Sequence, residues 1–359
     1  MENDRQDELI AIVDEFLMLL CESADYQSNG DVRAVLTEAG QAVATLRQRL
    51  SIASDRYIVA VVGLSNVGKS TLLNALLGSD LAPRRNGPCT PVPIEFSYGE
   101  NLRVVVHHSR SMTRSTWRCE NMAAIQERLA AVVDDAGESQ NREVRKIVVE
   151  IPVQLLEEGL VIADTPGFGA LQSAEAGGSH EVSLKRYLQE EVAQVFWVVL
   201  ADQGIGKREK LFHERFFGEV CDDIVVTGSE DWEPSDKERF KKLCSSMFPS
   251  RMPRFHFVSG LMGLRARKAG DLTGLEAAGI TLLEGRLREL TGYLGRIADI
   301  EERLHQIAAD LGAWCGEQRR VRRGPGRTLW RPDSWSRWLD CVSGNPFKIR
   351  LSGELGVHE

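Results

Sequence analysis

The chain has 359 residues, of which 43% are hydrophobic, so it is long and apolar enough to bury a sizeable core in one large or two ordinary domains. Its formal net charge of −8 argues against broad nucleic-acid binding, and no specific nucleic acid is expected as a partner. Seven scattered cysteines without a C-x-x-C pair indicate neither a zinc site nor a disulfide framework, as in a reduced cytoplasmic protein. The N-terminus is acidic, unlike a signal peptide, and the longest apolar run, residues 192–201, would span about 15 Å as a helix, half of a bilayer core.

The N-terminal segment, residues 1–52, is predicted to form two helices. Apolar side chains recur at three- and four-residue steps on one face of each, which is typical of amphipathic helices. They are Leu9, Val13, Phe16 and Leu20 in the first helix, and Val32, Val35, Ala39, Val43, Leu46 and Leu50 in the second. Gly30 marks the break between the two helices, with Asp31 as a candidate N-cap.

A glycine-rich loop follows, between an apolar strand and a helix. Residues 57–62 predict a buried strand, and residues 70–77 predict the helix after the loop. Between them, residues 63–71 read G-L-S-N-V-G-K-S-T and match the phosphate-binding pattern G-x-x-x-x-G-K-[ST] without a mismatch. The flanking strand and helix argue against a chance glycine-rich turn. Strands and helices alternate from here on, which predicts an α/β P-loop NTPase G domain over residues 53–270, with a mixed, mostly parallel sheet flanked by helices.

The loop predicts a nucleotide site that uses Mg²⁺. Glycines let backbone N–H groups point at phosphate oxygens, and the helix N-terminus adds partial positive charge behind them. Lys69 would reach the β- and γ-phosphates, and the Ser70 hydroxyl would bind Mg²⁺. The residues expected to contact nucleotide from this loop are Gly63, Ser65, Asn66, Val67, Gly68, Lys69, Ser70 and Thr71.

Two later motifs indicate a switch that responds to the nucleotide. Thr90, in G-P-C-T-P-V-P at residues 87–93, is a candidate second Mg²⁺ ligand, although alone it could be an ordinary turn residue. A strand at residues 160–164 ends in D-T-P-G, where Asp164 would support Mg²⁺ through water and the Gly167 N–H would reach the γ-phosphate. Residues 108–144, between these motifs, are polar and are interpreted as an insertion.

The C-terminal part returns to helix. Residues 271–318 predict one long helix with near-heptad apolar spacing, which favours a coiled coil. The spaced residues are Leu283, Leu287, Leu290, Leu294, Ile297, Leu304 and Leu311. We expect this helix to pair with the stripe in residues 32–50 as a helical neck; the alternative is that each stripe packs on the nucleotide domain. The tail, residues 319–359, is basic and contains tryptophans; we expect it to be poorly ordered, although it could contact acidic lipid headgroups or nucleic acid.

With these motifs the chain resembles a dynamin-family GTPase of the bacterial dynamin-like type. The residues that carry the resemblance are 63–71, 81–83, 87–93, 164–169 and 196–202. The resemblance covers about residues 50–265, and it implies binding of GTP and GDP, slow hydrolysis, and stimulation when two GTPase domains meet in a homodimer. A peripheral membrane location, or contact with a partner protein through the neck or basic tail, is compatible with it. No membrane-binding tip is recognisable, so membrane remodelling does not follow from the sequence.

The resemblance also has two departures. The loop interior, S-N-V-G-K-S, is similar to Era-like GTPases, in which the asparagine equivalent to Asn66 can help to hold a potassium ion, so K⁺ is a candidate cofactor. The family's base motif [NT]-K-x-D stands here as T-G-S-E-D at residues 227–231, with Gly228 replacing the lysine. Glu230 stands at the Asp position, and Asp231 follows one residue late. The candidate base contacts are Thr227, Glu230 and Asp231, with Ser259 in a later loop as a fourth. The loop of Ser259 could almost equally be an ordinary turn at the end of a strand.

Two functions from different classes stay open. The first is Mg²⁺-dependent hydrolysis of GTP to GDP and phosphate, coupled to dimerisation. Its catalytic residues would be Lys69, Asn66, Thr90 and Gly167, and its metal ligands Ser70, Thr90 and Asp164. The second is a nucleotide-binding scaffold with little turnover or relaxed base specificity, which the altered base motif would explain. Use of ATP is a weaker third option.

Overall fold

The computed structural model describes residues 2–25, 30–51, 56–83, 92–108, 113–138, 144–166, 177–217, 221, 223–245 and 253–321. The chain divides into two compact units. Unit 1 combines Met1–Leu50 with Arg296–Glu359, and unit 2 is formed by Ser51–Gly295. Unit 2 contains the glycine-rich loop and therefore the candidate site.

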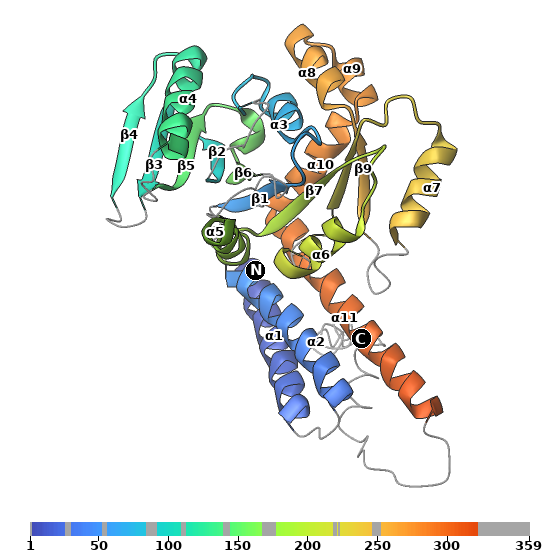
Figure 1. The fold of residues 1–359 in the computed structure, drawn as a ribbon. Helices are drawn as coiled ribbons and strands as arrows, with labels where there is room; N and C mark the ends of the chain where they lie inside the picture. The colour runs from blue at the N-terminus through green and yellow to red at the C-terminus, as the bar shows by residue number, and fades with distance from the viewer. Residues whose placement is uncertain are drawn as a thin grey trace, which may run out of the picture. The chain divides into compact units, whose positions relative to one another are not determined.

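Unit 1 is helical. Its described elements are α1 (Glu2–Asp25), α2 (Gly30–Ser51) and nearly all of α11 (Tyr293–Val321), as Figure 1 shows. Buried apolar side chains follow three- and four-residue steps and include Leu9, Val13, Phe16, Leu20, Val32, Val43, Leu46, Leu50, Ile297, Leu304 and Leu311. A Cβ added to Gly40 of α2 would lie 4.0 Å from the Cβ of Leu20, and Arg47 Nε donates to Asp14 Oδ1 over 2.7 Å. The apolar and polar faces of α1 and α2 therefore both contribute to their pairing.

The described part of unit 2 is built on one sheet of nine strands. Their order is β4-β3-β5-β2-β6-β1-β7-β8-β9. The strands are β1 (Tyr57–Val62), β2 (Ile94–Tyr98), β3 (Arg103–His108), β4 (Arg114–Arg118), β5 (Val144–Ile151), β6 (Leu160–Asp164), β7 (Gln194–Leu200), β8 (Asp223–Thr227) and β9 (Arg254–Val258). The glycine-rich loop leaves the central strand β1, so the candidate site lies at the middle of the sheet.

The sheet is parallel on one side of β6 and mixed on the other. β1 runs parallel to both β6 and β7, and β8 and β9 continue in parallel. β2 runs antiparallel to β6 and parallel to β5, and β3 runs antiparallel to β5 and β4. In the register, Val61 and Ile94 are both paired with Asp164. The carboxyl ends of β1 and β6 thus meet at one edge, where ligands bind in open α/β sheets.

Helices cover both faces of the sheet (Figure 1). One core contains side chains from α3 (Lys69–Leu77), α4 (Met122–Glu138), α8 (Gly260–Ala269), α9 (Leu272–Ala277), α10 (Ile280–Thr291) and the short 3-10 helix η1 (Gln154–Leu156). The opposite core contains side chains from α5 (Gly177–Glu190), α6 (Lys207–Phe216) and α7 (Pro234–Ser245). Val59 and Val61 of β1 face the first core, and Ile58, Ala60 and Val62 face the second. Burial on both faces explains why this strand is a continuous apolar run.

The predicted fold class is confirmed: unit 2 is α/β, with a mixed, mostly parallel sheet between helices. The sequence predicts strands at 57–62, 103–107, 145–151, 160–164, 195–200, 223–227 and 255–258, so β2 and β4 were not expected. β4 is an edge strand whose residues alternate between exposed and half-buried, inside the segment interpreted as a polar insertion. β2 carries a fully buried Glu95 as its second residue, between the apolar Ile94 and Phe96.

The C-terminal helical segment is divided differently from the expectation for residues 271–318. Helix α10 ends at Gly292, whose backbone is extended, and a new helix starts at Tyr293. Leu283 and Leu287 are buried in the core of unit 2, so the near-heptad series does not follow one helix. The division of residues into units, with α9 and α10 in unit 2, corrects the boundary at 270. Most of the basic tail, from residue 322, lies outside the described residues.

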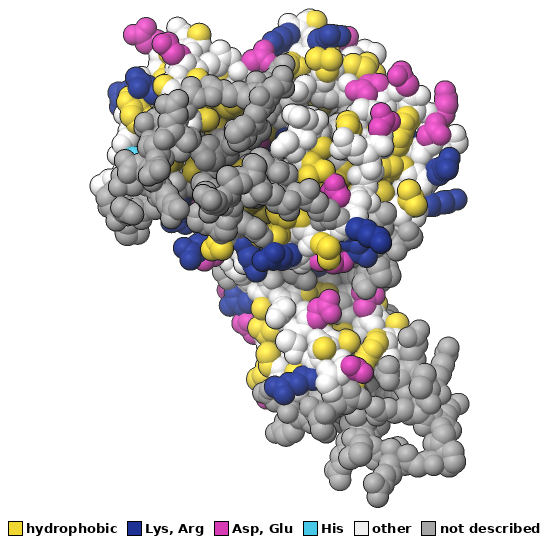
Figure 2. All heavy atoms as spheres, in the orientation of Figure 1, with side chains coloured by type: hydrophobic (Ala, Val, Ile, Leu, Met, Phe, Trp, Pro, Cys, Tyr) yellow, Lys and Arg dark blue, Asp and Glu magenta, His cyan; other side chains and the backbone are white. Residues whose placement is uncertain are grey.

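The described surface is mixed in charge. In Figure 2, acidic and basic side chains are interspersed over the described part of unit 2 on the face that is drawn. Within the described residues, no helix combines the length and the apolarity needed to cross a membrane.

Candidate nucleotide-binding site

The glycine-rich loop connects β1 to α3 through a backbone that needs its small residues. A Cβ at Gly63 would lie 2.4 Å from the carbonyl oxygen of Val198 on β7, a distance that no side chain tolerates. Gly68 has φ +91°, and Asn66 is the one described non-glycine residue with a positive φ, at +66°. Asparagine is among the few residues that adopt this conformation readily. The loop therefore turns tightly into α3, as a phosphate cradle requires.

Lys69 is the first residue of α3 and is only 8% exposed. Its ammonium group donates to the carbonyl oxygens of Gly63, at 3.1 Å, and Leu64, at 2.6 Å. These bonds satisfy a buried charge with the loop's own backbone. The ammonium group is thereby held inside the curve of the loop, where phosphate oxygens would compete for it.

Ser70 and Asp164 form the candidate metal site. Ser70 Oγ lies 3.5 Å from Asp164 Oδ2, across the gap between α3 and the end of β6. A hydroxyl and a carboxylate are hard oxygen donors of the kind that Mg²⁺ takes, with its other ligands supplied by phosphate and water. The residues present thus fit a magnesium ion held jointly with a nucleotide.

Burial raises the pKa of Asp164 from 3.8 to about 6, and the positive charge of Lys69 and the hydrogen bond from Ser70 oppose the rise. A divalent cation beside the carboxylate would act in the same direction as Lys69 and favour the ionised form. The adjacent Thr165 fixes this end of β6, because its hydroxyl donates to the Val61 carbonyl oxygen at 2.8 Å. Sequence reasoning did not assign Thr165, although a hydroxyl residue directly after the acidic residue was a visible signal.

Thr227 connects the base motif to the phosphate loop. Its hydroxyl lies 2.7 Å from the carbonyl oxygen of Val67 and 3.3 Å from that of Val199. A Cβ at Gly68 would also meet the Thr227 side chain at 3.6 Å. The hydroxyl is thus engaged with the protein backbone, which gives this candidate base contact a structural part in holding the two loops together.

Apart from the buried Ser229, the rest of the base motif is open to solvent. Gly228 has φ +72°, and a Cβ there would lie 2.9 Å from Leu200 Cδ1, the end of a flexible side chain. Glu230 and Asp231 are both exposed, in the turn between β8 and α7. Nearby, the Trp232 ring packs against Phe240, with centroids 5.4 Å apart. Both candidate carboxylates are therefore accessible to a ligand.

The last candidate loop packs directly on the start of α3. Ser259 caps α8, because its hydroxyl accepts from the Met262 backbone N–H at 3.3 Å. A Cβ at Gly260 would lie 2.9 Å from the backbone nitrogen of Leu72. The loop is therefore close to the phosphate-binding helix, while the Ser259 hydroxyl itself is used as a cap.

The structure therefore brings together several of the nucleotide-site residues that were predicted from the sequence. Ser65 and Thr71 are half-buried on the loop and the first turn of α3. Lys69, Ser70 and Asp164 converge at the carboxyl edge of the sheet. Two candidates, Thr90 and Gly167, lie outside the described residues, so their places in the site stay predictions.

Comparison with protein families agrees with this geometry. Residues 59–217, from β1 to just beyond α6, match the model of the dynamin family. These residues are therefore similar to the N-terminal part of dynamin-family proteins. The match includes the phosphate loop and Asp164 and ends before the base motif. The family match therefore covers the loop and the strand end that carry Lys69, Ser70 and Asp164.

Relatives show the same domain in longer proteins. A bacterial dynamin-like protein of Nostoc punctiforme is 33% identical over 114 residues, 31% of this chain and 16% of that protein. The isoniazid-induced protein IniC of Mycobacterium tuberculosis is 28% identical over 146 residues, 41% of this chain and 26% of that protein. A solved structure from an oligomerised bacterial dynamin pair, described as sensing and tethering membranes at long range, has a TM-score of 0.51 and 18% identity. It covers 96% of this chain and 51% of the solved one, so this chain spans about half the length of that dynamin.

Proposed function

We propose that the dynamin-family domain binds GTP with Mg²⁺ and hydrolyses it to GDP and phosphate. The observation that carries the proposal is the convergence of Lys69, Ser70 and Asp164 on one loop and one strand end, with Lys69 Nζ inside the curve of the loop. A phosphate cradle, a cation for the phosphates and a hard oxygen pair for a metal are the parts that phosphoryl transfer uses. The dynamin-family match of the same residues supports the reading.

The chain's own groups would divide the work as follows. Lys69 exchanges its two carbonyl partners for β- and γ-phosphate oxygens and so stabilises the charge that develops there. Ser70 and Asp164, joined by Thr90, would hold Mg²⁺, which would supply positive charge for the phosphates. Gly167 offers a backbone N–H to the γ-phosphate. Phe168 stands where some GTPases have a glutamine, so water would be positioned by backbone groups, an ion or a second copy.

Asn66 has a candidate part in an ion-assisted mechanism. It has a positive φ, at +66°, and lies two residues before Gly68 in the phosphate loop. We propose that it helps to hold K⁺ there, as in the Era-like GTPases that its loop resembles. Hydrolysis should then be faster in K⁺ than in Na⁺, and Asn66→Ala should abolish the difference. Equal rates of wild-type hydrolysis in the two salts would remove K⁺ from the mechanism.

Beyond the domain, we propose pairing of two copies through their GTPase domains, in the cytoplasm or peripherally at a membrane. The support is the family match and the solved bacterial dynamin, whose description names an oligomerised pair that tethers membranes. The neck formed by residues 1–52 and the C-terminal helix, and the basic tail at residues 319–359, are the proposed contacts to a membrane or partner protein. A rise in specific activity with protein concentration would support the pairing.

A nucleotide-binding scaffold with little turnover or relaxed base specificity is the second candidate. Gly228, which supplies no side chain to cover a base, and the exposure of both Glu230 and Asp231 favour it. This arrangement would leave phosphate binding intact while weakening the choice of base. Tight binding of both GTP and ATP with near-zero turnover would be its signature.

One experiment separates the candidates. The purified chain is titrated with fluorescent GTP and fluorescent ATP in Mg²⁺ and K⁺, and phosphate release is followed at several protein concentrations. A GTP preference with concentration-dependent release supports the GTPase. Lys69→Ala is the site variant, and Lys207→Ala, an exposed lysine at the start of α6, is the matched control. Normal hydrolysis by Lys69→Ala would overturn the assignment of the site.

A further inference from the structure

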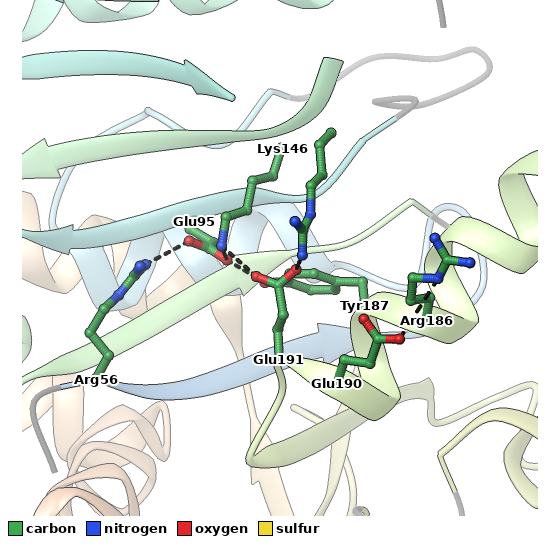
Figure 3. Close-up of polar contacts among 8 residues, drawn as sticks. Arg56, Glu95, Lys146, Arg186, Tyr187, Glu190 and Glu191 are labelled. Carbon is green, nitrogen blue, oxygen red and sulfur yellow. Dashed lines mark hydrogen bonds and ion pairs between the residues drawn. The ribbon is translucent and has the colours of Figure 1, made fainter. Parts of the chain in front are cut away.

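A largely buried cluster of charged and polar residues lies between the sheet and α5, outside the phosphate loop. It consists of Glu95 on β2, Lys146 on β5, Tyr187 on α5 and Glu191 just after α5, and is called the β2–α5 cluster below. In Figure 3 the carboxylates of Glu95 and Glu191 point toward the Lys146 ammonium group, with the Tyr187 ring alongside. Arg186 and Glu190, from the same helix, lie apart from it.

The cluster is densely bonded. Lys146 Nζ donates to Glu95 Oε1 at 2.8 Å and to Glu191 Oε2 at 2.5 Å. The Tyr187 hydroxyl donates to Glu95 Oε1 at 3.0 Å. Arg56 donates to Glu95 Oε2 at 2.7 Å, and Arg145 donates to Glu191 Oε1 at 2.5 Å. Both carboxylates are therefore satisfied on both oxygens, as buried charges require.

Burial increases the contribution of each of these bonds to stability. The Glu95 side chain is 0% exposed, and Lys146 and Tyr187 are also buried. Burial raises the pKa of Tyr187 well above 10, and the nearby Glu95 charge adds to the rise. The pKa of Glu191 is lowered by Lys146 and Arg145, against the effect of its burial. Removing one partner leaves a buried charge uncompensated, which costs far more than loss of an exposed pair.

The cluster lies next to the strand that carries the metal ligand. β2 pairs with β6 so that Glu95 is opposite Ala163, and the next pair in the ladder is Ile94 with Asp164. Ala163 belongs to the same core as Leu184, Tyr187 and Leu188 of α5, whereas Ile94 faces the α3 side. The cluster thus ties α5 to β2 on one face, one residue away from the point where Asp164 meets Ser70 on the other.

We propose that Glu95, Lys146, Tyr187 and Glu191 are positioning residues for the magnesium site, holding the end of β6 between β2 and β1 so that Asp164 stays within reach of Ser70. The proposal rests on the proposed function. Its physical basis is that supporting groups around a metal ligand set the orientation of that ligand and change metal affinity when they are lost. The backbone ladder joins β2 to β6 over only three residue pairs, from Ile94 to Phe96. Glu95 of the cluster adds a bond across β6, because it accepts from Arg56, the residue before β1.

The test measures the Mg²⁺ concentration that half-saturates binding of fluorescent GTP to the full chain. Tyr187→Phe removes one hydroxyl and keeps the ring, so the fold should survive. Glu191→Gln removes the charge that pairs with Lys146. Each should raise the half-saturating Mg²⁺ concentration by about 10-fold. Glu190→Gln is the control, because this exposed residue pairs only loosely with Arg186, at 3.8 Å, and should change nothing.

A second readout needs no metal. Amide hydrogen exchange of β2 and β6 in EDTA should be faster in Tyr187→Phe than in wild type or Glu190→Gln, because the local attachment is weakened. An unchanged Mg²⁺ requirement in both cluster variants would overturn the proposal. So would an equal loss of GTP affinity with and without Mg²⁺, which is what a general structural role produces. Failure of the wild-type chain to bind GTP, or binding that ignores Mg²⁺, overturns the proposed function and this proposal with it.

Discussion

The two sides of the nucleotide site differ in how firmly the protein holds them. On the phosphate side, the loop matches its motif without a mismatch, and Lys69, Ser70 and Asp164 are bonded to neighbouring groups. On the base side, the motif lacks its lysine, and Glu230 and Asp231 are exposed in a turn. The family match ends at residue 217, before the base motif. The comparison shows that contacts within the protein fix the groups on the phosphate side, whereas the two carboxylates on the base side are left exposed.

On the phosphate side, we expect the largest loss of nucleotide affinity from Lys69→Ala. Loss of the buried ammonium group should reduce affinity for Mg²⁺·GTP by on the order of 1000-fold, since a buried charge partner is removed from the phosphates. The fold should remain, because the ammonium group donates to two backbone carbonyls of its own loop rather than to another element of the sheet. Fluorescent GTP titration, with circular dichroism as the check on folding, measures both. Wild-type affinity in this variant would contradict the comparison.

The phosphate side should also show a pH dependence that the base side lacks. In the metal-free protein the Asp164 pKa rises from 3.8 to about 6, so the folded state binds its proton more tightly than the unfolded state. The free energy of unfolding should therefore fall by up to about 3 kcal/mol as pH rises from roughly 4 to 6. Asp164→Asn should remove this fall, and Asp231→Asn, on the base side, should keep it. Urea denaturation in EDTA across this range gives the answer.

Neutralising the two carboxylates on the base side one at a time tests which of them recognises the base. Glu230 stands where the family has its aspartate, so Glu230→Gln should lower the ratio of GTP to ATP affinity by about tenfold, the cost of one charge-assisted interaction. Asp231→Asn should change the ratio less. Competition of unlabelled GTP and ATP against a fluorescent analogue measures the ratio. If neither variant changes it, the base is read loosely and the scaffold alternative gains support.

Thr227 is where the two sides meet, and its loss should have the smallest effect. Thr227→Val keeps the shape of the side chain and removes the hydrogen bond to the Val67 carbonyl. We expect a loss of about 1 kcal/mol in the free energy of unfolding and a modest loss of GTP affinity. Thr37→Val is the control, because that hydroxyl bonds only to the carbonyl of Arg33 in its own helix. A GTP affinity unchanged in Thr227→Val would mean that the two loops are held together by other contacts.

Much of the central fold was predictable from local pattern. The strand at residues 57–62 is apolar at every position because both of its faces are buried. The loop that follows includes Gly68, which has a positive φ that glycine adopts easily. The acidic end of β6 was recognisable because an apolar strand ended abruptly in a carboxylate and a proline. These signals are local, since each depends on residues within a few positions of one another.

Other elements depended on partners far away in the chain. β4, with sequence R-S-T-W-R, has no buried face of its own and becomes a strand by pairing with β3. β2 was missed although apolar Ile94, Phe96 and Tyr98 alternate with polar Glu95 and Ser97, which is a strand signal. The burial of Glu95 makes sense only once Lys146, 51 residues later, lies beside it.

For this protein, then, the sequence by itself determined the phosphate loop, the α/β class of unit 2 and the identity of the metal-binding candidates, because spacing and residue type encode these locally. Only the tertiary structure decided where the C-terminal helices divide, since Gly292 separates α10 in unit 2 from α11 in unit 1. It also decided that Thr227 joins the base loop to the phosphate loop, and that the β2–α5 cluster lies against the strand of Asp164. Those results depend on buried contacts between distant segments, whose free energy exists only once the sheet has brought them together.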